Sequence, residues 1–363
     1  MNTFFVGSLS FAILIFPIGW RTSRAGAIDD NEPVYKGKPL SALVKPLRDK
    51  DARVRREAIS VLKVAVFAQL KEDWDWELAE QTVPFFNEAI KDKDAQVRAV
   101  ATEALDEFNI GPKAEAEVAR LIQALQDKDP QVRLLAADHL AFRFPAAKAA
   151  ASALTKALKD PDSAVRLKAA ITMGFLGPEG KAAVPLLIEG LKQEIRFLDC
   201  TRMDAAIALG RIGPDAKAAI PALTESLRDE LFFVRPEAAL ALGKIGPAAK
   251  AALPDLRRAL KDEKMNTRVS AAVALWWLEG KAKEPLPVLI EALQGRGKKG
   301  CEPVESGTIK LITTTLGEMG PKAREAIPLL MPLLKDREWS IRRAAADALK
   351  KIDPEVAKKT GLR

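Results

Sequence analysis

Apolar residues recur at intervals of three and four in short segments along this chain, and Asp, Gly and Pro separate the segments. A typical stretch, VRLKAAITMGFLG at 165–177, places its apolar residues on one side of a helix and ends at Gly177, which Pro178 follows. A glycine just past a helical pattern, with proline behind it, is a helix stop. The pattern therefore predicts short helices, each with one apolar stripe that needs a neighbouring helix to cover it.

The same segment recurs along the chain. Four copies begin with Gly-Pro, at 177–192, 213–228, 246–261 and 320–335. A second recurring feature is an arginine, usually preceded by valine, and the copies are 33 to 43 residues apart, with Ile309 in its place in the eighth unit. These anchor arginines are Arg55, Arg98, Arg133, Arg166, Arg202, Arg235, Arg268 and Arg342. The spacing predicts nine units with a basic period near 33 residues.

Each unit is interpreted as two helices, A and B. Helix A is expected to begin near a proline, at Pro84, Pro185, Pro221, Pro254, Pro287 or Pro328. An Asp-x-Asp loop follows, whose second Asp is placed to cap helix B, at Asp51, Asp94, Asp129 and Asp162. One such pair cannot bury its own core, whereas stacked pairs share a continuous one. The sequence therefore predicts one elongated α-solenoid.

These units resemble HEAT repeats, specifically the short HEAT-like variety found in phycobilin lyase subunits and in many bacterial proteins. The resemblance covers about residues 40–352. It implies an all-α fold, a right-handed superhelix of about nine stacked antiparallel helix pairs. It also implies a binding scaffold whose concave face or loop edges contact another macromolecule, because this repeat serves many unrelated functions.

The N-terminal segment has a different character. Residues 4–20 read FFVGSLSFAILIFPIGW, an uncharged apolar run, and small residues follow at 25–27. This resembles a secretory signal cleaved after Ala27, which predicts an exported protein, periplasmic or secreted. Both nearby arginines, Arg21 and Arg24, follow the apolar run, so an uncleaved membrane anchor at 4–20 is the alternative. The expected organisation is a signal at 1–27, a linker at 28–39, the solenoid at 40–352 and a tail at 353–363.

The composition restricts which catalytic and metal-binding sites the chain can form. The chain has one histidine, His139, one tyrosine, Tyr35, and two cysteines, so most metal sites and most histidine-dependent nucleophilic catalysis lack their side chains. The HEAT-like deoxyhypusine hydroxylases bind iron through paired His-Glu motifs, but Leu140 follows His139 here. We expect no catalytic residue, no metal and no cofactor. A phycobilin lyase-like role stays open, because those enzymes work largely by holding chromophore and protein together.

The two cysteines, Cys200 and Cys301, are 101 residues apart and lie in different units. About three helix pairs at roughly 8–10 Å per packed layer separate them by near 30 Å, far beyond the roughly 7 Å Cα limit of a disulfide. We expect no intramolecular disulfide.

The anchor arginine lies in the first turn of helix B, where the helix dipole disfavours a cation. An aspartate six residues earlier could offset this, at Asp49, Asp92, Asp127, Asp160, Asp229, Asp262 and Asp336. The structural hypothesis is a ladder of Arg–Asp contacts that ties neighbouring units together. The functional alternative is a row of ligand-binding arginines.

Two loop edges are the candidate binding sites. The turns from helix B to helix A carry a basic edge at Lys148, Lys181, Lys217, Lys250, Lys283 and Arg324. The opposite loops carry a candidate apolar edge at Phe232, Met265 and Trp339. The basic edge is either a solvated consensus or a contact for an anionic partner, and the apolar edge either packs loop on loop or contacts a protein.

Two insertions, at 71–81 and 294–307, are expected to form loops. A protein is the favoured partner. An anionic polymer, nucleic acid or glycan, along the basic edge is the alternative, but the edge has no interleaved aromatic residues and an exported chain seldom meets DNA. Membrane contact is expected only if 4–20 is retained.

Overall fold

Stacked helix pairs make up nearly all of the structure, a computed structural model that describes residues 34–35, 38–73, 76–107, 112–143, 146–193, 200–295 and 304–360. The all-α solenoid predicted from the repeat is confirmed. The one sheet in the described residues is a pair of two-residue antiparallel strands, β1 (Val34–Tyr35) and β2 (Lys38–Pro39), within the predicted linker. None of the described helices combines the length and the apolarity that crossing a membrane requires.

Nine B helices form one layer of the stack. They are α2 (Ala52–Asp73), α4 (Ala95–Glu107), α6 (Pro130–Ala141), α8 (Ser163–Phe175), α10 (Thr201–Ile212), α12 (Val234–Ile245), α14 (Met265–Glu279), α16 (Ser306–Met319) and α18 (Trp339–Ile352). The A helices form the other layer. They are α1 (Leu40–Val44), α3 (Trp76–Ala89), α5 (Pro112–Ala124), α7 (Ala151–Ala157), α9 (Val184–Leu191), α11 (Ile220–Ser226), α13 (Leu253–Ala259), α15 (Pro285–Gly295) and α17 (Ile327–Leu333).

The ends of the helices follow the predicted signals. Asp129 and Asp162 cap α6 and α8, and the side chain of Asp162 accepts bonds from the backbone N–H groups of Ala164 and Val165. Gly177 ends helix B of its unit with a φ of 92°, a conformation that residues with a Cβ rarely adopt. Short 3-10 helices follow such turns, for example η3 (Pro178–Ala183), and lead directly into the next helix A.

Three expectations about element boundaries differ from the structure. Pro84 lies inside α3 instead of at its start, because the first insertion lengthens α2 to Asp73 and begins α3 at Trp76. The first insertion therefore extends helices instead of forming a loop. The residues assigned to a C-terminal tail include α19 (Pro354–Lys359), which packs on α18 and buries Ala357. Most of the second insertion, 296–303, lies outside the described residues.

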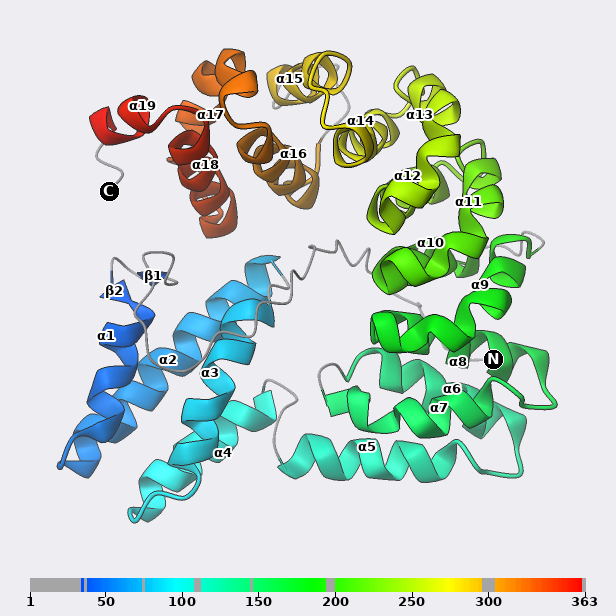
Figure 1. The fold of residues 1–363 in the computed structure, drawn as a ribbon. Helices are drawn as coiled ribbons and strands as arrows, with labels where there is room; N and C mark the ends of the chain where they lie inside the picture. The colour runs from blue at the N-terminus through cyan, green and yellow to red at the C-terminus, as the bar shows by residue number, and fades with distance from the viewer. Residues whose placement is uncertain are drawn as a thin grey trace, which may run out of the picture.

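The B layer lies on the inner side of a curved stack. In Figure 1, α10, α12, α14, α16 and α18 line the inside, whereas α9, α11, α13, α15 and α17 lie outside. Glycines let successive B helices approach closely. A Cβ at Gly174 would lie 2.4 Å from the Cβ of Ala208, and one at Gly317 would lie 2.9 Å from the Cα of Ala348. Close inner packing shortens the inside of the stack and so curves it.

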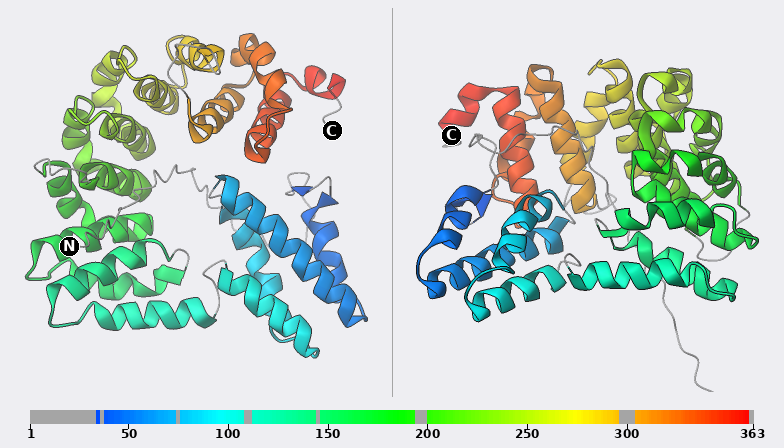
Figure 2. Two further views of the ribbon diagram at one scale, coloured as in Figure 1. Left: turned by 180° about the vertical axis from the view of Figure 1, so that it is seen from behind. Right: turned by 60° about the horizontal axis from the view of Figure 1, so that its bottom comes forward.

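This curvature brings the two ends of the solenoid together. Helix α18 of the last unit contacts α2 of the first, and the views in Figure 2 show the chain returning to its beginning. The stacked solenoid is as predicted, but the stack curves back on itself and is not elongated. Repeats of similar length specify that the helix pairs stack. The small residues on the inner side give the stack a curvature that brings its ends together over nine units.

Among the described residues, the apolar core is interrupted between the second and third units, hereafter the weak junction. Leu62, Phe86 and Leu105 belong to a separate apolar core formed by α2, α3 and α4. A second core begins at Val118 and continues through the central units to Leu278. Among the residues whose side chains are described, the first two units therefore share no buried apolar core with the third.

Candidate functional site

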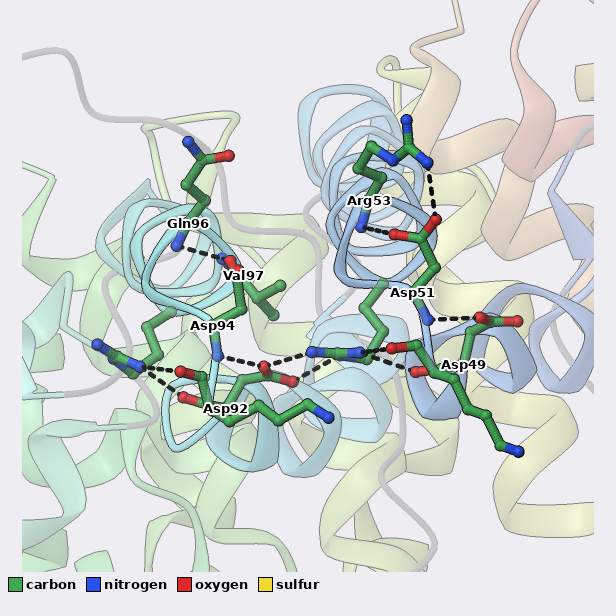
Figure 3. Close-up of polar contacts among 11 residues, drawn as sticks. Asp49, Asp51, Arg53, Asp92, Asp94, Gln96 and Val97 are labelled. Atoms are coloured by element: carbon green, nitrogen blue, oxygen red, sulfur yellow. Dashed lines mark hydrogen bonds and ion pairs between the residues drawn. The ribbon is translucent and has the colours of Figure 1, made fainter.

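In the described residues, four anchor arginines bridge consecutive units through aspartates, as Figure 3 shows around Asp92. Arg55 donates from Nε and Nη2 to the two carboxylate oxygens of Asp92, 37 residues later, at 2.8 and 2.7 Å. Arg133 forms the same paired contact with Asp160 at 2.7 and 2.8 Å. Two further rungs join Arg202 to Asp229 at 3.2 Å and Arg235 to Asp262 at 3.1 Å. The carboxylate that receives each arginine belongs to the next unit.

The aspartate of the arginine's own unit contributes its backbone instead. The Nη1 of Arg98 donates to the carbonyl oxygens of Asp92 and Lys93, at 2.7 and 3.0 Å. Five other anchors hold the two corresponding carbonyls, namely Arg55, Arg133, Arg166, Arg268 and Arg342. These carbonyls follow the C-terminal end of helix A, where the helix dipole favours a cation, which offsets the unfavourable start of helix B.

One rung is missing at the weak junction. Within the described residues, no contact joins Arg98 of the second unit to Asp127 of the third, and the carboxylate of Asp127 accepts only the backbone N–H of Asp129. Where its rungs form, the ladder is a structural link between consecutive units. Its alternative role in ligand binding stays a prediction.

The six residues of the basic edge are all exposed and lie in the turns between helix B and helix A. Two of them face acids: the Nζ of Lys181 lies 2.9 Å from Asp215, and the Nε of Arg324 lies 3.5 Å from Asp353. Exposed pairs of this kind contribute little stability, but they reduce the local excess of positive charge. The edge is thus less basic than the sequence alone indicates.

The apolar edge is not a continuous exposed surface. Phe232 is 54% exposed, with its ring edge-on to Phe233. Met265 is half-buried against the core of the later units, and Trp339 is half-buried beneath the Arg343 guanidinium. Met265 and Trp339 each begin a helix B, and in this position their side chains point toward the stack. Of the three predicted residues, only Phe232 is an exposed apolar side chain.

The structure shows an exposed stripe on α6 that the sequence interpretation missed. Val132, Leu135 and Phe142 are exposed, and His139 lies with them at intervals of three and four residues. Leu135 is 56% and Phe142 52% exposed. The opposite face of α6 carries the buried core residues, so this stripe, hereafter the α6 stripe, points away from its own core.

A second missed feature is a row on the B helices, hereafter the inner row: Phe142, Phe175, Arg211, Lys244 and Trp277. Each residue lies nine positions after an anchor arginine, a signal that a column-by-column comparison of the repeats contains. The guanidinium carbon of Arg211 lies 4.7 Å from the centre of the Phe175 ring, and Arg211 donates to the Phe175 carbonyl oxygen. The side chains of Lys244 and Trp277 lie over Gly210 and Gly243 of the preceding helices.

Charge along the row is shaped by burial. Burial lowers the pKa of Arg211 to about 10. Burial also lowers the pKa of Lys244, an effect that Glu237 opposes and the positive charge of Arg211 reinforces. The pKa of Glu237, seven residues earlier on α12, is raised by burial. The inner row therefore holds cations that solvent screens poorly.

No group of His, Cys, Asp and Glu within the described residues is arranged to hold a metal ion. Cys200 carries a free, half-buried thiol, and Cys301 lies outside the described residues, so the disulfide expectation is not tested.

Comparison with known proteins identifies the repeats. The model for HEAT repeats matches residues 118–197 and 309–360, and the model for the PBS lyase HEAT-like repeat matches 201–229 and 234–262. No curated protein matches the sequence.

Several solved structures share parts of the fold. The complex of CpcE and CpcF of phycocyanin lyase from Nostoc sp. PCC7120 is 25% identical over 68% of this chain and 94% of that one, with a TM-score of 0.48. An engineered protein is 21% identical over 86% of this chain and 88% of its own, with a TM-score of 0.40. The Escherichia coli protein YibA is 20% identical over 74% of this chain and 96% of its own, with a TM-score of 0.36.

The two repeat models together match more than half of the chain, and the matched segments coincide with the stacked helix pairs. The chain therefore belongs to the HEAT-repeat family, with repeats of the PBS lyase HEAT-like type at its centre.

Proposed function

We propose that this chain is a non-enzymatic scaffold that binds another protein through the B-helix side of the solenoid. The observation that carries the proposal is the α6 stripe, where Leu135 and Phe142 are more than half exposed. Large apolar side chains aligned on one exposed helix face are typical of a protein contact surface. The inner row supports the same function, because aromatic residues and arginine are the residue types enriched at energetic centres of interfaces.

The test uses residues 28–363 and a double variant, Leu135→Ser with Phe142→Ser. Proteins captured from an envelope extract by the unchanged chain should be depleted at least about tenfold by the double variant, because each apolar side chain contributes about 1.5–3 kcal/mol when buried. Quantitative mass spectrometry measures the depletion. The variant should unfold as the unchanged chain does, since exposed side chains contribute little to stability.

Phe232→Ser is the matched control, because Phe232 is 54% exposed but lies on the apolar loop edge and not in the α6 stripe. It should leave capture by the α6 stripe unchanged. If Phe232→Ser removes the captured proteins and the double variant retains them, the binding surface is the loop edge and the proposal is wrong. Capture of lipid or glycan without protein would also contradict it.

A phycobilin lyase-like role is the second candidate function. The match of residues 201–262 to the PBS lyase HEAT-like repeat favours it, since repeats of that name occur in proteins that handle bilin chromophores. Titration with a free bilin separates the two functions. Saturable binding with a shifted bilin absorbance supports the lyase-like role, whereas an unchanged spectrum supports the protein scaffold.

We also propose export, on the basis of the apolar run at 4–20 and the small residues before Ile28. The mature protein should begin at Ile28 when its N-terminus is determined from a cell envelope fraction. A mature chain that begins at Met1 and stays with the membrane after a salt wash would instead support the retained anchor.

A further inference from the structure

Two neighbouring cations at the centre of the inner row have no carboxylate within ion-pair distance, although the charge of Glu237, on the same helix, acts on Lys244. Arg211 of α10 uses the ring and the carbonyl oxygen of Phe175 of α8, the latter at 3.2 Å. Lys244 of α12 extends over Gly210, the residue beside Arg211, so both cations lie at the same level of adjacent helices. Among the described residues, no ion pair joins either cation to an acid.

Aromatic rings bound this pair on both sides. Phe175 contacts Arg211, and Trp277 of α14 lies over Gly243, the residue beside Lys244. The indole Nε1 of Trp277 donates to Glu318 at 3.1 Å, which fixes the ring. The site is therefore two neighbouring cations between two aromatic rings.

Burial makes these cations costly as they stand. Burial lowers the pKa of Lys244; the charge of Glu237 opposes this shift and the charge of Arg211 adds to it, so the charged form of Lys244 is less favourable than that of an exposed lysine. An anion placed between the two side chains would favour that charged form and would be held by charge-assisted hydrogen bonds.

Acids on the same helices restrict which anion fits. Asp204 and Glu237 each lie seven residues, about 10 Å of helix, before the two cations. A phosphate polymer, with a charge at every nucleotide, would bring several negative charges near these carboxylates, whereas a single acidic side chain brings only one. The flanking rings would accept apolar neighbours of that side chain.

From this arrangement we infer that Arg211 and Lys244 form a subsite for an acidic side chain, Asp or Glu, that lies beside apolar residues in a bound protein segment. The inference rests on the proposed function, since it specifies the chemistry of the protein partner. It assigns the central B helices a contact separate from the α6 stripe.

Two short peptides test the subsite directly: acetyl-Phe-Glu-Glu-Phe-amide and its Gln-Gln counterpart. The acidic peptide should bind at least about tenfold more tightly, as measured by NMR titration at fixed salt. Arg211→Gln and Lys244→Gln should each remove this preference. Arg211→Lys retains the charge and should keep most of it, which separates a lost contact from a damaged fold.

Lys250→Gln is the matched control, because Lys250 is exposed on the basic edge and the change removes the same charge. It should leave the preference intact. Equal binding of the two peptides, or an equal loss in Lys250→Gln, overturns the subsite. Tighter binding of a single-stranded octathymidylate than of the acidic peptide also overturns it and favours a phosphate ligand.

A second measurement follows the lysine itself in the unchanged protein. Lys244 should react with acetic anhydride near neutral pH faster than its half-buried position alone would allow, and the acidic peptide should slow that reaction while leaving Lys250 unaffected. Reaction rates that the peptide does not change contradict the subsite. If protein capture depends on the α6 stripe while both peptide tests fail, the subsite is wrong and the proposed function stands.

Discussion

Replacing Gly174 with alanine should lower the free energy of unfolding by about 2 kcal/mol. The same replacement usually stabilises a helix interior by up to about 1 kcal/mol, so the sign of the effect is diagnostic. The added Cβ would lie 2.4 Å from the Cβ and 3.1 Å from the Cα of Ala208, and the helix backbone of α10 cannot yield as a flexible side chain does. Urea denaturation followed by helical circular dichroism measures the loss.

The consequence should extend to the shape of the molecule. A larger residue at 174 pushes α8 and α10 apart on the inner side, which reduces the curvature and separates α18 from α2. The radius of gyration from small-angle X-ray scattering should therefore increase in Gly174→Ala. An unchanged radius together with increased stability would contradict the close-packing explanation of the curved stack.

Gly190→Ala is the matched control on α9. A Cβ there first meets the Cδ1 of Leu167 at 2.9 Å, the far end of a flexible side chain, so the change should stay within about 0.5 kcal/mol of the unchanged chain. A second comparison adds Ala208→Gly to Gly174→Ala. Moving the methyl group to the other helix should recover part of the lost stability, a coupling expected only for residues in contact.

Much of the local structure could be predicted from the sequence because short-range chemistry determines it. The cap at Asp162 requires only an aspartate two residues before the backbone N–H group that donates to it. The helix end at Gly177 requires only a residue that readily adopts a positive φ. Repetition then fixed the number of stacked pairs. Pro84 was misplaced because a period of 33 residues does not show that an insertion can lengthen the helices on both sides of it.

The closed shape and the candidate site depend on longer-range geometry. Curvature depends on which side of the B helices carries small residues. In the sequence, Gly174 and Gly317 are only residues of low helix propensity, and their role is seen when the facing residue of the next B helix is known. For Met265 the sequence leaves exposure and packing both open because it adjoins a loop, whereas in the structure it begins α14 and turns toward the core. Arg211 and Lys244 do not stand out in the sequence, because they are ordinary charged residues until their shared position in successive repeats is compared.

Replacing Asp160 with asparagine should cost about 3 kcal/mol, because it leaves the guanidinium of Arg133 without its carboxylate in a largely enclosed place. The side chains of Asp160 and Arg133 are only 7% and 11% exposed, and two hydrogen bonds of 2.7 and 2.8 Å join them between consecutive units. The loss should be concentrated at the junction of α6 and α8. Hydrogen exchange measured by mass spectrometry should show faster exchange there than in α16.

Asp127→Asn provides the matched control in the preceding unit. Asp127 occupies the same place in the Asp-x-Asp loop and accepts the same backbone bond, from Asp129, but it receives no bridging arginine. Its replacement should cost less than about 1 kcal/mol. Equal losses at the two positions would show that the local turn, and not the link between units, accounts for the conserved form of the loop within this chain.

The pH dependence separates the ion pair from the turn in a second way. The Arg133 guanidinium, through its hydrogen bonds, holds the pKa of the Asp160 carboxyl below its ordinary value. An aspartate with a lowered pKa in the folded state stabilises the fold above the unfolded value of about 3.9, and this contribution is lost as pH falls through the folded value. The stability difference between the unchanged chain and Asp160→Asn should therefore stay constant from neutral pH to about pH 5 and shrink below about pH 4. A difference that persists in acid would mean that packing or the turn, and not the charge, is what the asparagine disturbs.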